Sequence, residues 1–175
     1  MAARRSPTTA RLSRGLATWR RRAAQRMTAS RRETLRFVRR LPEAEIARPR
    51  TIDAWSVKDV LAHLLACDEE TAKRFRLIAR GRGDRIHWFE SMADADRFNA
   101  RTVARLRKRG LGALLQRLQR VRAALVADFR RLPTASLHDP AHAYPVTQWL
   151  PAPGWSHERY HVAEIRVWWS RRKRA

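Results

Sequence analysis

Apolar residues recur every three or four positions along most of the chain, which is the spacing of helices that bury one face. Alternation of apolar and polar residues, which is typical of a half-buried strand, is nearly absent. The pattern predicts helices over residues 30–41, 56–80, 92–108, 114–132 and 156–170. The predicted fold class is therefore all-α, a bundle of four or five helices.

Turn-forming residues mark where these helices begin and end. Ser56 is followed three residues later by Asp59, the arrangement of a capping box at a helix start. Pro133 ends the fourth helix, and four more prolines follow within residues 134–154. A connection of this length predicts at least one crossover before the last helix, rather than helices joined only by short turns.

Composition narrows the class of protein. The chain has 175 residues, of which 44% are hydrophobic, enough to close the core of one domain. No stretch approaches about 18 uncharged apolar residues, so the sequence predicts no membrane span. Cys67 is the single cysteine, which excludes an internal disulfide and is typical of the reducing cytoplasm. We therefore expect a cytoplasmic protein.

Basic residues far outnumber acidic ones, with 39 Lys and Arg against 16 Asp and Glu and a net charge of +23. About half of this excess lies in two short ends, residues 1–26 and 171–174. A nucleic-acid-binding domain more often carries its basic stripe on the folded body. We interpret the charge as a solvated arginine-rich surface and expect no specific nucleic-acid partner, although the tails could contact phosphate backbones without sequence preference.

The first 26 residues contain eight arginines and no acid. Their apolar residues follow helical spacing up to the start of the next segment: Leu12, Leu16, Trp19, Ala23 and Met27. Three interpretations are open: a disordered extension, a reading frame that truly starts at Met27, and a basic amphipathic targeting helix. We favour the first two. The expected organisation is a basic disordered extension (1–26), a helical bundle (27–170) and a basic tail (171–175).

Three histidines fall where their side chains could meet. His157 and His161 are four residues apart in the last predicted helix and so share one face. His63 lies within an apolar run of the second helix, where a surface histidine would be out of place. Imidazoles on facing helices can bind one divalent metal ion and leave a fourth position open. The alternative is three separate histidines that hydrogen-bond at the edge of the core.

The single cysteine and the other three histidines are not expected to bind the metal. Cys67 follows His63 by one helical turn, and we expect it to be a small buried hydrophobe rather than a fourth ligand. His87, His138 and His142 lie in predicted loops and are expected to face solvent.

The segment WSVKDVLAHL, residues 55–64, resembles the W-S-x-x-D-x-L-x-H-L signature of the DinB-like superfamily. The closing segment HERYHVAEI, residues 157–165, is similar to the family's last helix, and the likeness extends from Met27 to Trp169. The resemblance implies a four-helix bundle in which three histidines bind a divalent metal, usually zinc or nickel. Carried over to this chain, the ligands are His63, His157 and His161.

The resemblance also implies candidate activities. Relatives include transferases and isomerases that use mycothiol, bacillithiol or glutathione, as well as ClbS/DfsB proteins that protect against a genotoxin. We therefore expect a metal-dependent enzyme that activates a low-molecular-weight thiol or water, for transfer to or hydrolysis of a small electrophile. The alternative is a non-catalytic binding or self-resistance bundle. A small-molecule substrate and a homodimer are the expected partners.

Overall fold

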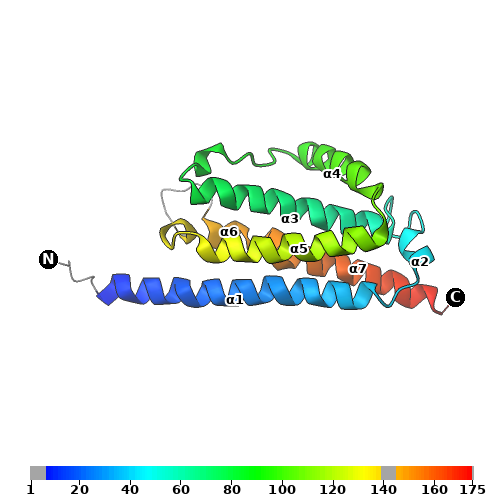
Figure 1. The fold of residues 1–175 in the computed structure, drawn as a ribbon, viewed down its shortest axis with the longest axis horizontal. Helices are drawn as coiled ribbons and strands as arrows, with labels where there is room; N and C mark the ends of the chain where they lie inside the picture. The colour runs from blue at the N-terminus through cyan, green and yellow to red at the C-terminus, as the bar shows by residue number, and fades with distance from the viewer. Residues whose placement is uncertain (1–6, 139–144, 175) are drawn as a thin grey trace.

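The computed structural model describes residues 7–138 and 145–174. Four long helices form its body (Figure 1): α1 (Pro7–Val38), α3 (Val57–Ala79), α5 (Leu111–Arg131) and α7 (His157–Arg172). The described residues contain no strand, only an isolated bridge between Ile52 and Trp55. The all-α prediction is confirmed. None of the described helices is long and apolar enough to cross a membrane.

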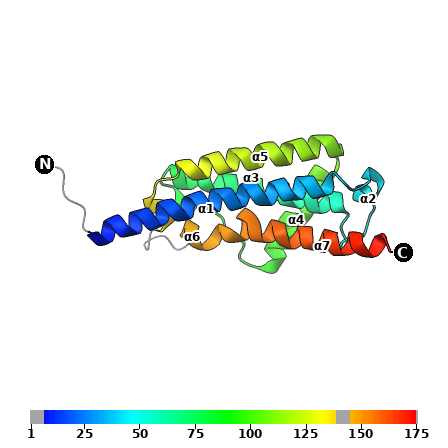
Figure 2. The ribbon, with the colours of Figure 1, turned by 90° about the horizontal axis from the view of Figure 1, so that it is seen from below.

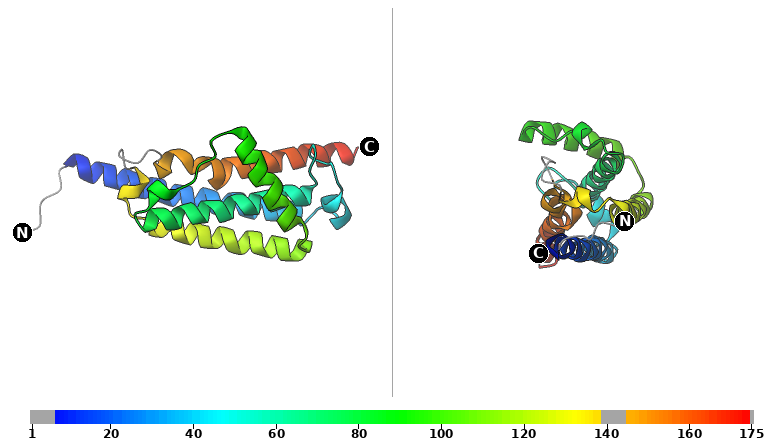
Figure 3. Two further views of the ribbon diagram at one scale, coloured as in Figure 1. Left: turned by 90° about the horizontal axis from the view of Figure 1, so that it is seen from above. Right: turned by 90° about the vertical axis from the view of Figure 1, so that its left-hand side faces the viewer.

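Each long helix packs against two others, and α1 lies between α5 and α7 (Figure 2). Helices α3 and α5 run in the same direction, so the chain must return along the bundle between them. Helix α4 (Met92–Arg107) makes this return along the outer side of α3, as Figure 3 shows. The structure therefore has its crossover between α3 and α5. The sequence predicts one within residues 134–154, but the short helix α6 (Val146–Trp149), which leads into α7, lies near the end of the bundle where α5 stops (Figure 1).

Short elements complete the connections: α2 (Glu43–Ala47), η1 (Gly83–Arg85), η2 (Ala135–Leu137), α6 (Val146–Trp149) and the π-helical η3 (Ala152–Ser156). The proline-rich connection is thus partly helical. Its last part, η3, runs directly into α7, so the final helical stretch begins earlier than residue 156. Leu150, between α6 and η3, is fully buried, which ties this connection to the core.

Helix α1 is much longer than the predicted helix over residues 30–41. Residues 7–26 are helical, which differs from the disordered extension expected for residues 1–26. The reason is apolar packing, because Ala23 and Ala24 are buried and Trp19 packs edge-on against Phe129 of α5. The helical spacing of the apolar positions therefore outweighs the high arginine content of this segment.

The capping box at the start of α3 is confirmed. The Ser56 hydroxyl accepts a hydrogen bond from the Asp59 backbone N–H at 3.1 Å, and Asp59 accepts one from the Ser56 N–H at 3.1 Å. A cap of this kind stabilises a helix by about 1 kcal/mol. It fixes the first turn of α3, and His63 follows two turns into the same helix.

Two apolar clusters make up the core, one toward each end of the bundle. The first includes Met27, Phe75 and Phe129, and the second includes Val38, Leu118 and Ile165. Buried polar side chains occupy the level between them: Ser30, Arg31, Thr34, His63, Asp68, Thr71, Arg122 and Glu158. The middle of the bundle is therefore a polar layer, and it contains the candidate site.

Candidate metal centre

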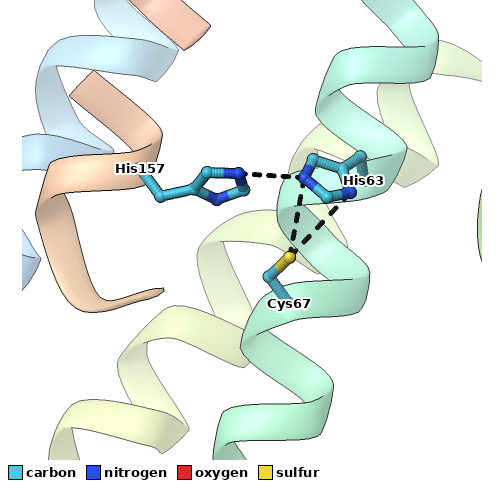
Figure 4. A group of neighbouring side chains, drawn as sticks. All are labelled: His63, Cys67 and His157. Atoms are coloured by element: carbon cyan, nitrogen blue, oxygen red, sulfur yellow. Dashed lines mark hydrogen bonds between the residues drawn. The ribbon is translucent and has the colours of Figure 1, made fainter. Parts of the chain in front are cut away.

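The structure brings the three predicted histidines together. Nε2 of His63 on α3 lies 3.1 Å from Nε2 of His157 on α7 (Figure 4). Nε2 of His161, one turn further along α7, lies 3.0 Å from the same His157 nitrogen. The rings meet edge to face, with centroids 4.5–5.2 Å apart. The Nε2 atoms of His63 and His161 thus both lie within 3.1 Å of the His157 nitrogen.

The spacing of these nitrogens suits a single small cation. Zinc binds imidazole nitrogen at about 2.0–2.1 Å, and two ligands of a tetrahedral ion are then about 3.3 Å apart. The two Nε2–Nε2 separations that involve His157 are 3.0 and 3.1 Å. Each of these two histidine pairs is therefore close to the spacing of two ligands of one ion.

The protonation state of the histidines also favours metal binding. Burial, together with the neighbouring His157 and His161, lowers the pKa of His63 to about 3. Burial and His161 lower the pKa of His157 to about 4. Both rings are consequently neutral near pH 7, and a neutral imidazole offers the lone pair that a metal requires.

Glu164 orients the third ring. Its Oε2 lies 2.8 Å from Nδ1 of His161, so this carboxylate accepts a hydrogen bond from Nδ1–H. The hydrogen bond assigns the tautomer and leaves the Nε2 lone pair of His161 directed at the cluster. Carboxylates bonded to metal-ligating histidines commonly serve this purpose in proteins.

Cys67 belongs to the same group of side chains. Its Sγ lies 3.7 Å from Nε2 of His63, and the potential ligand atoms of His63, Cys67 and His157 all lie within 4.8 Å of one another. Burial and the nearby Asp68 carboxylate raise the pKa of its thiol to about 12. The thiol is therefore protonated when no metal is bound. Its position differs from that of the plain core residue expected from the sequence.

Side chains from neighbouring elements cover the outer side of His63. The Trp55 ring lies 5.1 Å from the imidazole, measured between centroids. Asn99 of α4 forms a hydrogen bond with His63 that partly offsets the lowering of its pKa. The crossover helix α4 thus forms one wall of the site.

A buried tetrad of charged residues joins all four long helices beneath the histidines. It consists of Arg31 from α1, Asp68 from α3, Arg122 from α5 and Glu158 from α7, and each is at most 3% exposed. Arg122 binds both carboxylate oxygens of Asp68, at 2.6 and 3.0 Å, and its Nη2 lies 3.1 Å from Glu158. Arg31 donates to Glu158 at 2.6 Å and lies 3.2 Å from Asp68.

The tetrad is electrically balanced. Burial alone would lower the pKa of Arg31, but the two carboxylates outweigh it and raise the pKa. Burial alone would likewise raise the pKa of Glu158, but the two guanidinium groups lower it. Asp68 follows Cys67 in sequence, and Glu158 follows His157. The tetrad therefore holds α3 and α7 in the register that brings the candidate ligands together.

Sequence reasoning missed the tetrad and Glu164. A weak signal for Glu164 was its place three residues after His161, which puts it within reach on the same helical face. As expected, His87 and His138 are exposed, whereas His142 lies outside the described residues.

Comparison with curated proteins and with solved structures found no match. A model of the DinB superfamily matches residues 26–165, which include the histidine cluster and the charged tetrad. The match covers most of the chain, and the chain therefore belongs to the DinB superfamily.

Proposed function

We propose that His63, His157 and His161 hold one divalent ion, zinc or nickel, in an open site that serves thiol- or water-dependent chemistry on a small electrophile. The position of His157 Nε2, 3.1 Å from Nε2 of His63 and 3.0 Å from Nε2 of His161, carries this proposal. Three protein ligands with a free position are the arrangement of catalytic rather than structural zinc sites. Such an ion supplies Lewis acidity, which makes a thiol or a water molecule nucleophilic near neutral pH.

The chain's own residues have separate tasks in this proposal. Burial keeps His63 and His157 neutral, so they need not lose a proton before they bind the ion. Glu164 accepts the hydrogen bond from Nδ1–H of His161, which keeps the proton on that nitrogen and fixes the orientation of the ring. The ion pairs of the tetrad maintain the register of α3 against α7.

Cys67 decides which chemistry is available. If the fourth position stays open, a small thiol or water can occupy it. If Cys67 occupies it, the centre is closed and structural in character. In the open form that we propose, the Cys67 thiol keeps its proton, whereas a Cys67 bound to the metal would be deprotonated. We also place this activity in the cytoplasm, where an unpaired cysteine stays reduced.

Turnover of simple electrophiles tests the proposal. The transfer assay uses 1-chloro-2,4-dinitrobenzene with mycothiol, bacillithiol or glutathione, and the hydrolysis assay uses p-nitrophenyl acetate. We expect turnover in one of them to be lost after chelation, to return with zinc or nickel, and to be absent in His63→Ala. His87→Ala is the matched control because this histidine is exposed and does not belong to the histidine cluster.

Two results would contradict the proposal. Turnover that survives in His63→Ala would show that the reaction does not use the cluster. Bound metal without turnover in any of the assays would favour the non-catalytic binding bundle.

A further inference from the structure

A second concave site lies between α1 and α5. It is a groove of about 820 Å³ whose lining residues come from these two helices alone. On α1 they are Thr28, Arg31, Arg32, Leu35, Arg36 and Arg39, and on α5 they are Gln119, Arg122, Ala123, Val126 and Arg130. The volume falls within the range of small-molecule sites, which is about 300–1,000 Å³.

The charge of this groove is strongly one-sided. Six of its lining residues are arginines and none is acidic. Asp68 and Glu158 balance two of them, Arg31 and Arg122, from the side of the core. The other four are exposed, and in the described part of the chain no carboxylate or hydrogen-bond acceptor pairs with their guanidinium groups: Arg32, Arg36, Arg39 and Arg130.

The base of the groove combines apolar surface with a buried donor. Leu35 and Val126 are 5% and 6% exposed and present aliphatic surface. Arg31 Nη2 is buried and makes no hydrogen bond, although it lies 3.2 Å from Asp68. Arg31 is already paired with carboxylates on the side of the core, so the exposed arginines of the rim are the ones left to bind an anionic group.

We propose that this groove binds a small amphipathic anion, a molecule with an apolar body and one or two phosphate or carboxylate groups. The apolar base would take the body, and the arginine rim would take the anionic group through paired N–H donors. This site is separate from the histidine cluster and does not depend on its metal.

Other occupants fit the groove less well. A second copy of this chain that used the same face would bring one arginine rim against another, and electrostatic repulsion opposes that contact.

Binding of 1-naphthyl phosphate, measured by calorimetry in 150 mM salt, tests the proposal, with 1-naphthoate as the carboxylate analogue. Inorganic phosphate supplies the charge without the body, and 1-naphthol supplies the body without the charge. We expect one saturable site per chain for at least one of the two amphipathic anions, and binding at least tenfold weaker for both partial probes. No saturable binding of either anion, or equal binding of inorganic phosphate, would overturn the proposal.

Two pairs of variants locate the site. Ala123→Trp fills the groove without a change of charge, whereas Ala124→Trp alters an exposed neighbour on α5 that does not line it. We expect the first to weaken binding at least tenfold and the second less than twofold.

The second pair of variants tests the role of charge. The triple variant Arg32→Gln/Arg36→Gln/Arg39→Gln removes three arginines of the groove. The control, Arg22→Gln/Arg101→Gln/Arg120→Gln, removes three exposed arginines outside it. Equal weakening within either pair would mean that the anion binds elsewhere or only through overall charge.

Discussion

His63 and His157 are separated by 94 residues of sequence, yet their Nε2 atoms lie 3.1 Å apart across the interface of α3 and α7. A buried and a half-buried imidazole at this distance cannot both be protonated without strong repulsion, which agrees with their low pKa values of about 3 and about 4. They can share one proton in a hydrogen bond, or they can share one metal ion.

Glu164→Gln should weaken metal binding without abolishing it. The amide can still contact His161 but cannot hold the Nδ1 proton as strongly, and changes behind a metal ligand typically cost 10–100-fold in affinity. Competition with a chromogenic chelator measures the effect. Glu33→Gln, an exposed glutamate on α1, is the control and should change the affinity less than twofold. A Glu164→Gln affinity equal to that of the wild type would remove Glu164 from the site.

Cobalt substitution should show whether Cys67 is a ligand. With an open fourth position, the cobalt protein should lack a sulfur-to-cobalt charge-transfer band until a small thiol is added. Cys67→Ser should behave in the same way. A band that is present in the wild type without added thiol and lost in Cys67→Ser would show that Cys67 closes the site.

Breaking the tetrad should destabilise the fold strongly. Arg122→Met leaves the Asp68 carboxylate buried with too little compensation, and a loss of this kind costs about 3–5 kcal/mol. Arg117→Met on the same helix removes a partly exposed ion pair with Glu69 and should cost about 0–1 kcal/mol. Urea denaturation at pH 7 gives both values. Equal costs for the two variants would mean that the tetrad does not hold the bundle together.

The metal-free protein should lose stability as the pH falls from about 6.5 to about 4.5. In this window the unfolded chain takes up protons on His63 and His157, whereas the folded protein, with pKa values of about 3 and about 4, does not. The unfolded state binds more protons, so the free energy of unfolding decreases by up to about 1.4 kcal/mol per pH unit for each histidine. Urea denaturation of the chelator-treated protein across this range measures the slope.

Two double variants check the origin of that slope. His63→Ala/His157→Ala should flatten it, whereas His87→Ala/His138→Ala should leave it unchanged because both of these side chains are exposed. An unchanged slope in the first double variant would assign the pH dependence to other groups.

The helices and the histidine cluster were largely accessible from the sequence because each depends on local spacing. Ser56 and Asp59 mark the start of α3, and the four-residue step from His157 to His161 places both on one helical face. The arrangement of the helices in space was harder to predict, because the return of α4 along α3 depends on packing between distant segments.

The charged tetrad could not be predicted for a different reason. Arg31 and Arg122 stand among many arginines, and nothing local distinguishes a buried one from those on the surface. Their burial depends on Asp68 and Glu158, which lie 37 and 36 residues away in sequence from Arg31 and Arg122 respectively. The high arginine content also led us to expect disorder in residues 7–26, although Leu16 and Trp19 follow the spacing of a helix.

Metal content tests the central claim most directly. Plasma mass spectrometry of tag-free protein should find about one zinc or nickel ion per chain in the wild type. The His157→Ala/His161→Ala variant should have lost it while its circular dichroism remains helical, and His87→Ala/His138→Ala should retain it. Stoichiometric metal in the His157→Ala/His161→Ala variant, or none in the wild type even after incubation with zinc and nickel, would contradict the account.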